Sequence, residues 1–408
     1  MTGMDEQDVI RALQAAGEAL RAGLQSVRQT DRPEDFLGGV HGALAAFGVR
    51  ADRINLPATP RFGFRHPTYG MALLTWHVDG DAVVELVPHT QSRKRLENGQ
   101  QNLHGTPYYP IIIEKQPSFR VRLSEGGQGL PLLERLSGEG YRDYVAIGLP
   151  LPNGEVQPFS VCSREPFPDD IQRRLSYLIP LLSASADAFY AGYAAFHVAT
   201  TYLGRQTGPR VLEGTFTRGE TDMIRAGILF CDLRGFTALS ERLGADGVVP
   251  VINRVFDCIG QAVQAEDGEI LKFIGDAVLS IFPAPSGSCP EALATRLIAV
   301  VRSGLERVSA LSEELEYTVA VGFGGHVGDV LYGNIGTSER LDFTVMGPAV
   351  NLASRLEGLC KSYDASAIFS AEVGKFRDDL VMLGSTSVKG ISTPVQVYGL
   401  SPQDMDAT

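Results

Sequence analysis

Two aspartates in the C-terminal half of the chain are placed where they could hold a divalent cation. Asp232 ends the short apolar run AGILFCD, which predicts a buried strand, and it directly precedes a predicted helix. Asp276 lies in the Gly-Asp turn of EILKFIGDAVLSIF, which predicts a tight hairpin. Two neighbouring carboxylates repel each other, and a hard cation such as Mg²⁺ would relieve that repulsion. Considered singly, each aspartate is better explained as a helix cap or a turn residue.

Two further features of the same region suit a phosphate ester. The helix after Asp232 begins near Phe236 and Thr237, and free backbone N–H groups at a helix start bind polyphosphates. Asn351 and Arg355 are four residues apart on a helix predicted to start at a Gly-Pro pair, so they share one face. A neutral donor and a permanent cation that point the same way can hold a phosphoryl oxygen as charge develops on it. As an isolated pair, these two residues are better explained as part of a solvated helix face.

The order of these segments along the chain carries more information than any one of them. FCDLRGFT, LKFIGDAVLSIF and YGNIG…DFTVMGPAVNLASRLE closely resemble the metal, substrate and transition-state segments of the class III nucleotidyl cyclases. The resemblance covers nearly all of residues 223–400 and consists of several ungapped blocks in the right order. It implies an α+β catalytic domain of ferredoxin-like or palm type over residues 223–402. The activity it implies is that of an adenylate cyclase, which converts ATP to 3′,5′-cyclic AMP and pyrophosphate.

The resemblance also implies a role for each matching residue. Asp232 and Asp276 match the two metal-binding aspartates, which implies two Mg²⁺ ions per site, with Mn²⁺ as the alternative. Asn351 and Arg355 match the catalytic pair that positions the ribose and stabilises the transition state. The remaining matches are expected to bind substrate, the first two at the adenine and the other three at the phosphates: Lys272, Thr344, Phe236, Thr237 and Lys389.

One position departs from the commonest pattern of the family. Thr344 lies seven residues before Asn351, where most adenylyl cyclases have an aspartate that reads the purine amino group. A threonine there resembles the subgroup called class IIIb, some members of which respond to bicarbonate, and its hydroxyl can still accept the amino hydrogen. Guanylyl cyclases present an acid in place of Lys272. ATP is therefore the expected substrate, with a guanylate or dual-specificity cyclase and a catalytically inactive nucleotide-binding signalling protein as alternatives.

The resemblance implies a homodimer, because in this family each active site lies between two catalytic domains, and this chain carries both sets of site residues. A heptad repeat within residues 168–222, which predict a helical stalk and a coupling linker, is a separate reason to expect pairing. A parallel two-stranded stalk would bury that repeat. Packing of the same stripe on the protein's own first domain is the alternative for its first half. The repeat consists of Leu175, Leu182, Phe189, Phe196 and Leu203.

Residues 1–167 predict a separate α+β domain, with two helices followed by strand-like runs. Their order resembles GAF-type sensor domains, which implies regulation of catalysis by a small-molecule effector. His66, Trp76 and His77 could line a small-molecule or haem pocket, but packed aromatic and hydrogen-bonded histidine side chains explain them better. Strands are predicted at residues 71–78, 82–87, 111–113, 144–149 and 156–162.

The composition argues against several classes of protein. The 36 Lys and Arg residues are outnumbered by 48 Asp and Glu, and the formal net charge of −12 speaks against binding of nucleic acid. The five cysteines include no CxxC pair, so neither a zinc site nor a disulfide framework is supported. The N-terminus is unlike a signal peptide, and residues 175–203 are too polar for a membrane span. We expect a cytoplasmic protein without a membrane or nucleic-acid partner.

Overall fold

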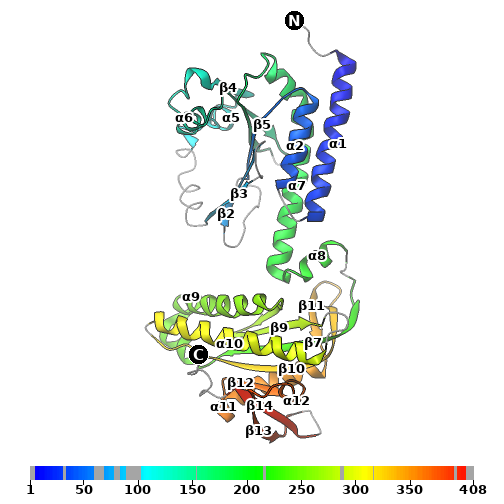
Figure 1. Ribbon diagram of the computed structural model, residues 1–408, viewed down its shortest axis with the longest axis vertical. Coiled ribbons are helices and arrows are strands. Elements are labelled where there is room, and N and C mark those ends of the chain that lie inside the picture. The colour runs from blue at the N-terminus through cyan, green and yellow to red at the C-terminus, as the bar shows by residue number, and fades with distance from the viewer. Residues whose placement is uncertain are drawn as a thin grey trace. The chain divides into compact units, whose positions relative to one another are not determined.

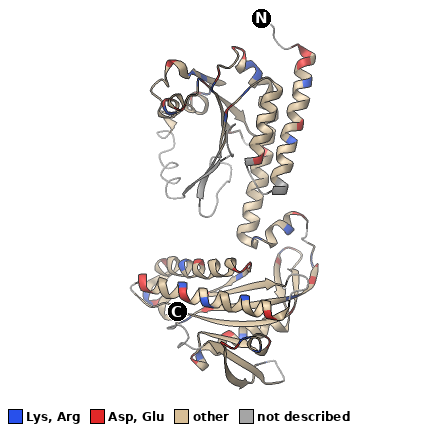
Figure 2. Ribbon diagram, viewed as in Figure 1, with Lys and Arg blue, Asp and Glu red and all other residues tan. Residues whose placement is uncertain are grey.

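The computed structural model divides the chain into two compact units, residues 1–198 and residues 199–408, each with its own sheet (Figure 1). Lys and Arg are interspersed with Asp and Glu on the ribbons of both units in Figure 2. The structure describes residues 5–30, 34–58, 69–77, 83–88, 103–152, 154–214, 217–284, 289–315, 317–389 and 393–400.

The first unit is an antiparallel six-stranded sheet in the order β3-β2-β1-β6-β5-β4, with helices on both faces. Helices α1, α2 and α7 enclose the larger core on one face, and α5 and α6 lie on the other (Figure 1). The strands are β1 Arg53–Ala58, β2 Tyr69–His77, β3 Val83–Pro88, β4 Ser118–Arg122, β5 Asp143–Pro150 and β6 Val156–Ser163. The helices are α1 Glu6–Thr30, α2 Glu34–Ala46, α5 Tyr109–Ile112, α6 Pro131–Gly138 and α7 Ile171–Leu203, with a 3₁₀ turn at Leu123–Glu125.

Neighbouring residues of β2 point to opposite faces of this sheet, as alternation along a strand requires. Trp76 stacks on His41 of α2, with ring centroids 4.2 Å apart. His77 faces the other side, where its Nδ1 lies 3.4 Å from the Tyr141 hydroxyl. The packed and hydrogen-bonded interpretation of these two residues is therefore confirmed. His66, the third residue considered for a pocket, lies outside the described residues.

Helix α7 packs the first half of the heptad stripe on the protein's own first unit. Leu175, Leu182 and Phe189 are buried in the core that this helix shares with α1 and α2. The Phe189 ring stacks on that of Phe36 in α2, with centroids 4.6 Å apart. Of the two explanations for this half of the stripe, packing within the unit is the one the structure supports. The last two members of the stripe, Phe196 and Leu203, are only partly buried.

The prediction of a strand at residues 111–113 is wrong, because these residues belong to the end of helix α5 and the turn that follows it. An apolar run of three residues shows no periodicity, so it cannot distinguish a buried helix from a strand. Strands β1 and β4 were not predicted. Both are short, and β1 contains Asn55 and Pro57, two residue types that are depleted in strands.

The second unit is built on an eight-stranded sheet in the order β13-β14-β12-β10-β7-β9-β8, with β11 paired to β10. Neighbouring strands are antiparallel except for β10 and β12. Helices α9 and α10 enclose the main core on one face, and α11 packs against β10 (Figure 1). The strands are β7 Thr221–Leu233, β8 Glu269–Ile274, β9 Ala277–Pro283, β10 Val321–Gly336, β11 Leu341–Met346, β12 Ala367–Ser370, β13 Val381–Thr386 and β14 Val395–Leu400. The helices are α8 Thr207–Leu212, α9 Phe236–Ala265, α10 Pro290–Glu314, α11 Pro348–Tyr363 and α12 Ala371–Gly374.

Residues 321–336 form the single long strand β10 although they are rich in glycine. Glycine usually indicates a turn, but in this strand its lack of a side chain lets a helix pack closely against the backbone. A Cβ at Gly324 would lie 2.2 Å from the backbone nitrogen of Glu357, so α11 can approach β10 this closely only over glycine. The C-terminal half of β10 pairs with β11, and this hairpin encloses a smaller core with β7, β8 and β9.

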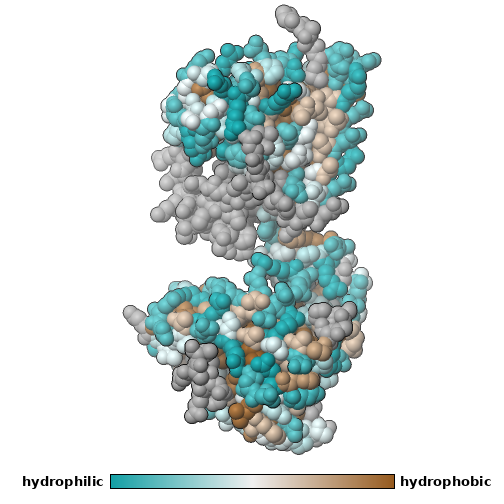
Figure 3. All heavy atoms as spheres, viewed as in Figure 1, coloured by the Kyte–Doolittle hydropathy of each residue, from teal (hydrophilic) through white to brown (hydrophobic). Residues whose placement is uncertain are grey.

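Among the helices that the structure describes, none has the length and apolar content needed to cross a bilayer. Figure 3 shows one face of the molecule, on which apolar residues of the second unit form several patches between hydrophilic ones. Large apolar side chains exposed in this unit include Met223, Phe273, Ile274, Leu331 and Met346.

Candidate active site

Asp232 and Asp276 lie next to each other where β7 and β9 pair. Asp232 is in register with Ala277, which directly follows Asp276 in the chain. Gly275 has a φ of +67° and makes the turn that holds Asp276 at the tip of the β8–β9 hairpin. Burial raises the pKa of the Asp232 carboxyl, and the charge of Asp276 raises that pKa further. The structure therefore brings together the two acids that the sequence singles out.

A third carboxylate, which sequence reasoning missed, belongs to the same cluster. Glu357 projects from α11 toward Gly322, the cross-strand partner of Asp232, with Oε1 3.2 Å from where a Cβ on Gly322 would lie. Burial raises the pKa of Glu357 to about 7, and the charges of Asp232 and Asp276 add to that rise. Arg234 acts in the opposite direction. Only the close packing of α11 on the glycines of β10 reveals this neighbour.

The chemistry of this cluster fits a divalent cation. Hard carboxylate oxygens suit Mg²⁺ and Mn²⁺, and a cation between Asp232 and Asp276 would offset the repulsion that raises the pKa of Asp232. In the described part of the chain, no group of three or more His, Cys, Asp or Glu side chains is arranged to hold a metal. Mg²⁺ is commonly held by one or two carboxylates together with water and substrate phosphates, and Asp232 with Asp276 could supply two.

The start of α9 presents unbonded backbone donors beside Asp232. The first hydrogen bond of this helix runs from the Leu239 N–H to the Gly235 carbonyl, so the N–H groups of Phe236, Thr237 and the next residue have no partner within the helix. Gly235 is the N-cap, with a φ of +70° and no side chain to cap the helix. Thr237 is exposed and is the second residue of the helix, two positions after the N-cap.

Asn351 and Arg355 share the exposed face of α11, as their spacing predicts. The opposite face of the helix is buried through Ala353, Leu356 and Cys360. Among the described residues, neither Asn351 nor Arg355 has a side-chain hydrogen bond or an ion pair. An arginine that is exposed and unpaired is available to an anionic ligand.

Lys272 and Thr344, the two residues expected at the adenine, are not joined by a hydrogen bond in the described structure. The Lys272 ammonium instead donates to the carboxylate of Asp342, which links β8 to β11. These two strands are not neighbours in the sheet. Thr344 lies two residues after Asp342 and is only 8% exposed. Asp342 is a second functional candidate that sequence reasoning missed.

Lys389, expected at the terminal phosphates, lies exposed in the connection between β13 and β14. It forms no hydrogen bond or ion pair with another residue that the structure describes. Within one chain, no described contact joins Lys272, Arg355 or Lys389 to the pair Asp232 and Asp276.

The segment that precedes β7 is attached to the catalytic sheet through a buried carboxylate. Glu269, the first residue of β8, accepts hydrogen bonds from the backbone N–H groups of Gln206 (2.9 Å) and Thr207 (3.1 Å) at the start of α8. The hydroxyls of Thr207 and Tyr332 donate to the other carboxylate oxygen, each over 3.2 Å. Any side chain at position 204 would collide with this carboxylate, because a Cβ on Gly204 would lie 2.2 Å from Oε1 of Glu269.

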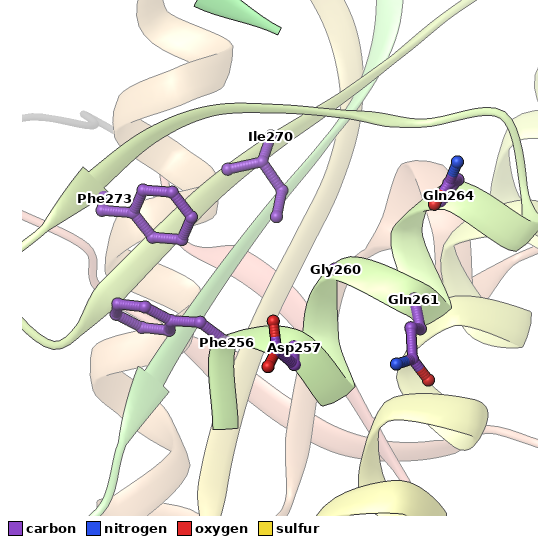
Figure 4. A pocket seen from close by; sticks show the side chains of 7 residues that line it. All are labelled: Phe256, Asp257, Gly260, Gln261, Gln264, Ile270 and Phe273. Carbon is purple, nitrogen blue, oxygen red and sulfur yellow. The ribbon is translucent and has the colours of Figure 1, made fainter. Parts of the chain in front are cut away.

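A groove of about 330 Å³ lies between α9 and β8 (Figure 4). The Phe256 and Phe273 rings face each other at one end, with centroids 4.6 Å apart. The predicted site residues are not among the described residues that line it, which are Phe256, Asp257, Gly260, Gln261, Gln264, Ile270 and Phe273.

The region that carries this site matches a known protein family. Residues 220–398 match the model of the adenylate and guanylate cyclase catalytic domain. Adenylate cyclase 1 of Rhizobium meliloti (strain 1021) is 35% identical over 180 residues, which are 42% of this chain and 26% of that protein. An adenylate cyclase of Anabaena cylindrica is 34% identical over 184 residues, which are 44% of this chain and 36% of that protein. The chain thus matches well under half the length of these relatives.

Two solved cyclase structures each match less than half of this chain. The adenylyl cyclase CyaB from P. aeruginosa is 29% identical, with a TM-score of 0.41, and the match covers 45% of this chain and 96% of that one. The guanylyl cyclase Cya2 is also 29% identical, with a TM-score of 0.39, over 45% of this chain and 95% of that one. By the match to the family model, residues 220–398 form an adenylate and guanylate cyclase catalytic domain.

Proposed function

We propose that this protein is an adenylate cyclase that converts ATP to 3′,5′-cyclic AMP and pyrophosphate at the interface of a homodimer. The observation that carries the proposal is the juxtaposition of Asp232 and Asp276 across β7 and β9. Asp232 lies four residues before Phe236, where α9 begins with N–H groups that have no partner within the helix, in a region that matches the cyclase family. Carboxylates for cations and backbone donors for phosphates are what a nucleoside triphosphate site requires.

The reaction is an intramolecular phosphoryl transfer. The ribose 3′-oxygen forms a bond to the α-phosphorus, the bond from that phosphorus to the bridging oxygen of the β-phosphate breaks, pyrophosphate leaves, and the hydroxyl proton passes to water. Asp232 and Asp276 would hold two Mg²⁺ or Mn²⁺ ions, which when bound neutralise the triphosphate and lower the pKa of the attacking hydroxyl. Arg355 would stabilise the charge on the α-phosphoryl oxygens. Asn351 would orient the ribose.

The remaining residues would bind the rest of the nucleotide. The N–H groups at Phe236 and Thr237 would receive the triphosphate at the start of α9. Lys389 would meet the terminal phosphates, and Lys272 with Thr344 or a neighbour would contact the base. The relatives at 34–35% identity include adenylate cyclases, which favours ATP as substrate. A guanylate or dual-specificity cyclase is the second candidate, since a solved guanylyl cyclase is as similar in sequence as a solved adenylyl cyclase.

We include a homodimer in the proposal because a single chain does not bring its candidate catalytic residues into contact. Arg355 and Asn351 are exposed and unpaired, and no described contact joins them to the aspartate pair within the chain. Two copies arranged so that the α11 face of one meets the aspartates of the other would complete two equivalent sites. We also propose that the N-terminal unit, a GAF-like sensor, regulates these sites in response to a small-molecule effector.

Mixing inactive variants tests the shared site directly. Asp232→Ala and Arg355→Ala chains are each expected to be inactive alone. When they are co-expressed with different tags, each mixed dimer keeps one intact site out of two. The mixture is therefore expected to regain roughly one quarter of the wild-type specific activity. Failure to regain activity in isolated mixed dimers would contradict the shared site.

The activity itself is tested with the purified full chain. ATP and GTP are offered side by side with Mg²⁺ or Mn²⁺, with and without bicarbonate, and cyclic nucleotide and pyrophosphate are measured. We expect cyclic AMP and pyrophosphate in equal amounts. A protein that binds ATP but forms no cyclic nucleotide under any of these conditions would be a nucleotide-binding signalling protein instead.

A further inference from the structure

The start of α11 meets β10 at Gly328, and the space over this glycine holds an imidazole. A Cβ on Gly328 would lie 2.7 Å from Nε2 of His326 and 2.8 Å from the Cβ of Ala349, the second residue of α11. His326 and Gly328 are two residues apart on β10, so their side-chain positions share one face of the strand. The His326 ring therefore lies against the first turn of the helix that carries Asn351 and Arg355.

The other edge of the same ring is held by the end of β12. Nδ1 of His326 lies 2.7 Å from the hydroxyl of Ser370, which is fully buried, and His326 itself is 8% exposed. Ser370 is the N-cap of α12, yet its side chain does not cap that helix, so its hydroxyl is available to the imidazole. One side chain thus connects β10, the start of α11 and the start of α12.

The surroundings of His326 favour the neutral ring. Burial lowers the pKa of His326, and Arg225 on β7 lowers it further. Glu372 on α12 acts in the opposite direction, with a carboxylate oxygen 3.6 Å from Nδ1. The folded protein therefore holds this proton less tightly than the unfolded chain. The stability that the neutral ring contributes is complete above the ordinary pKa of 6.5 and is lost as the pH falls below it.

The helix start beside the ring makes protonation costly as well. The first hydrogen bond of α11 runs from the Asn351 N–H to the Gly347 carbonyl, so the N–H groups of Ala349 and Val350 have no partner within the helix. Gly347 is the N-cap and provides no side chain to cap them. These groups form the positive end of the helix dipole, and a protonated Nε2 would add a second positive charge next to it.

A displacement of this helix start would reach the candidate catalytic residues. Asn351 is two residues after Ala349, and Arg355 is one further turn along the same uninterrupted helix. Both side chains have to be placed accurately to act on a phosphoryl group, because positioning errors of about 1 Å are costly to catalysis.

We propose that His326 is a positioning residue for Asn351 and Arg355: its neutral ring holds the start of α11 on β10, and uptake of a proton by the ring displaces that start and lowers kcat. This inference rests on the proposed cyclase function, and it adds to that function a response to acid pH.

A pH profile tests the proposal with His326→Asn, which keeps a polar group near Ser370 but cannot take up the proton. The kcat for cyclic AMP formation by the full chain is measured with saturating ATP and Mg²⁺ from about pH 8 to about pH 5. At about pH 8 we expect the variant to lie within about threefold of the wild type. Below about pH 6 the ratio of variant to wild-type kcat should rise at least about threefold. This ratio cancels the titration of ATP and of Glu357, which both proteins share.

Glu372→Gln provides a second, independent shift. It removes the carboxylate that favours the protonated ring, so the acid-side fall in kcat should begin at a lower pH than in the wild type. The matched control is His104→Gln, since His104 is an exposed histidine of the first unit and should leave the whole profile unchanged. Thermal unfolding of each variant at about pH 8 checks that all of them fold alike.

The outcomes separate this inference from the function on which it rests. If the wild type cyclises neither ATP nor GTP at any pH, the proposed function fails. If the wild type is active and the ratio for His326→Asn stays constant with pH, the imidazole only supports the fold and the inference is wrong. An unchanged or upward-shifted acid limb in Glu372→Gln would also overturn it, while the cyclase function would stand.

Discussion

Asp143 at the start of β5 and Asp232 near the end of β7 are both carboxylates set into a sheet, but their surroundings are opposite. Asp143 is 1% exposed and accepts hydrogen bonds from Arg120 Nε (3.2 Å) and Nη2 (2.7 Å) and from the Phe167 N–H (3.0 Å). Asp232 has Asp276 and Glu357 as its charged neighbours. Burial of a carboxylate therefore says little about function, whereas burial beside other carboxylates creates a repulsion that a bound cation would relieve.

The largest effect on activity should come from substitution of Asp232 or Asp276, whose carboxylates form no ion pair in the described structure. Asp232→Ala or Asp276→Ala is expected to lower cyclic AMP formation by at least roughly 10³-fold, because several kcal/mol of charge stabilisation depend on the cations they would hold. The unfolding temperature should stay the same or rise, since each substitution removes like-charge repulsion. Activity is measured with the purified protein, ATP and Mg²⁺. A variant with near-normal activity would show that these two carboxylates have no catalytic role.

Arg355→Ala should have the next largest effect. An unpaired cation that acts only on the transition state is expected to contribute roughly 10²-fold to kcat and little to the KM for ATP. Arg225→Ala, which removes an exposed arginine from an ion pair in the same unit, is the matched control and should leave both constants unchanged. An increase in KM at constant kcat would assign Arg355 to substrate binding alone.

The paired acid should affect stability instead of catalysis. Asp143→Ala leaves Arg120, whose side chain is 14% exposed, without its carboxylate, and is expected to cost about 3–5 kcal/mol of unfolding free energy. The control is Asp169→Ala, which breaks an exposed pair with Arg122 and should cost less than about 1 kcal/mol.

The chain's single tryptophan, Trp76, lies in the first unit, so its fluorescence during urea unfolding reports on that unit. If Asp143→Ala and Asp169→Ala lose the same unfolding free energy, Asp143 has no special structural role in the first unit. If the first unit regulates catalysis, Asp143→Ala should also change the basal rate once that unit is unfolded.

Glu357 should give the smallest effect, and one that depends on pH. Its pKa in the folded protein is about 7 against an ordinary value of 4.5, so the folded state holds this proton more tightly than the unfolded chain. The resulting stabilisation is complete below the ordinary value and is lost as the pH rises to about 7. In EDTA, Glu357→Gln should therefore lose less stability than the wild type between about pH 5 and about pH 8. Parallel unfolding curves for the two proteins would contradict this.

Local signals were enough to predict the elements that carry most of the candidate site. The Gly-Asp pair predicts the hairpin that holds Asp276, and the Gly-Pro pair predicts the start of the helix that carries Asn351 and Arg355. In each case a few adjacent residues determine the backbone, so no knowledge of the rest of the fold is needed.

The missed features depend on neighbours that are distant in the sequence. Asp342 meets Lys272 across 70 residues, and Phe273, the residue after Lys272, packs on Phe256 of α9. Glu357 joins the aspartates only because α11 approaches β10 over Gly324. Alternation and turn signals describe a strand by itself, and they carry no information about such contacts.

The attachment of α8 to Glu269 bears on where an autonomous catalytic fragment can begin. The family match starts at residue 220, after α8, whereas the compact unit starts at Ala199. A truncation at residue 220 would take three of the four hydrogen-bond donors away from Glu269, a carboxylate that is 4% exposed, at a cost of at least about 1–3 kcal/mol. Because Glu269 begins the strand that carries Lys272, the excised fragment would be impaired in the strand it needs for the base.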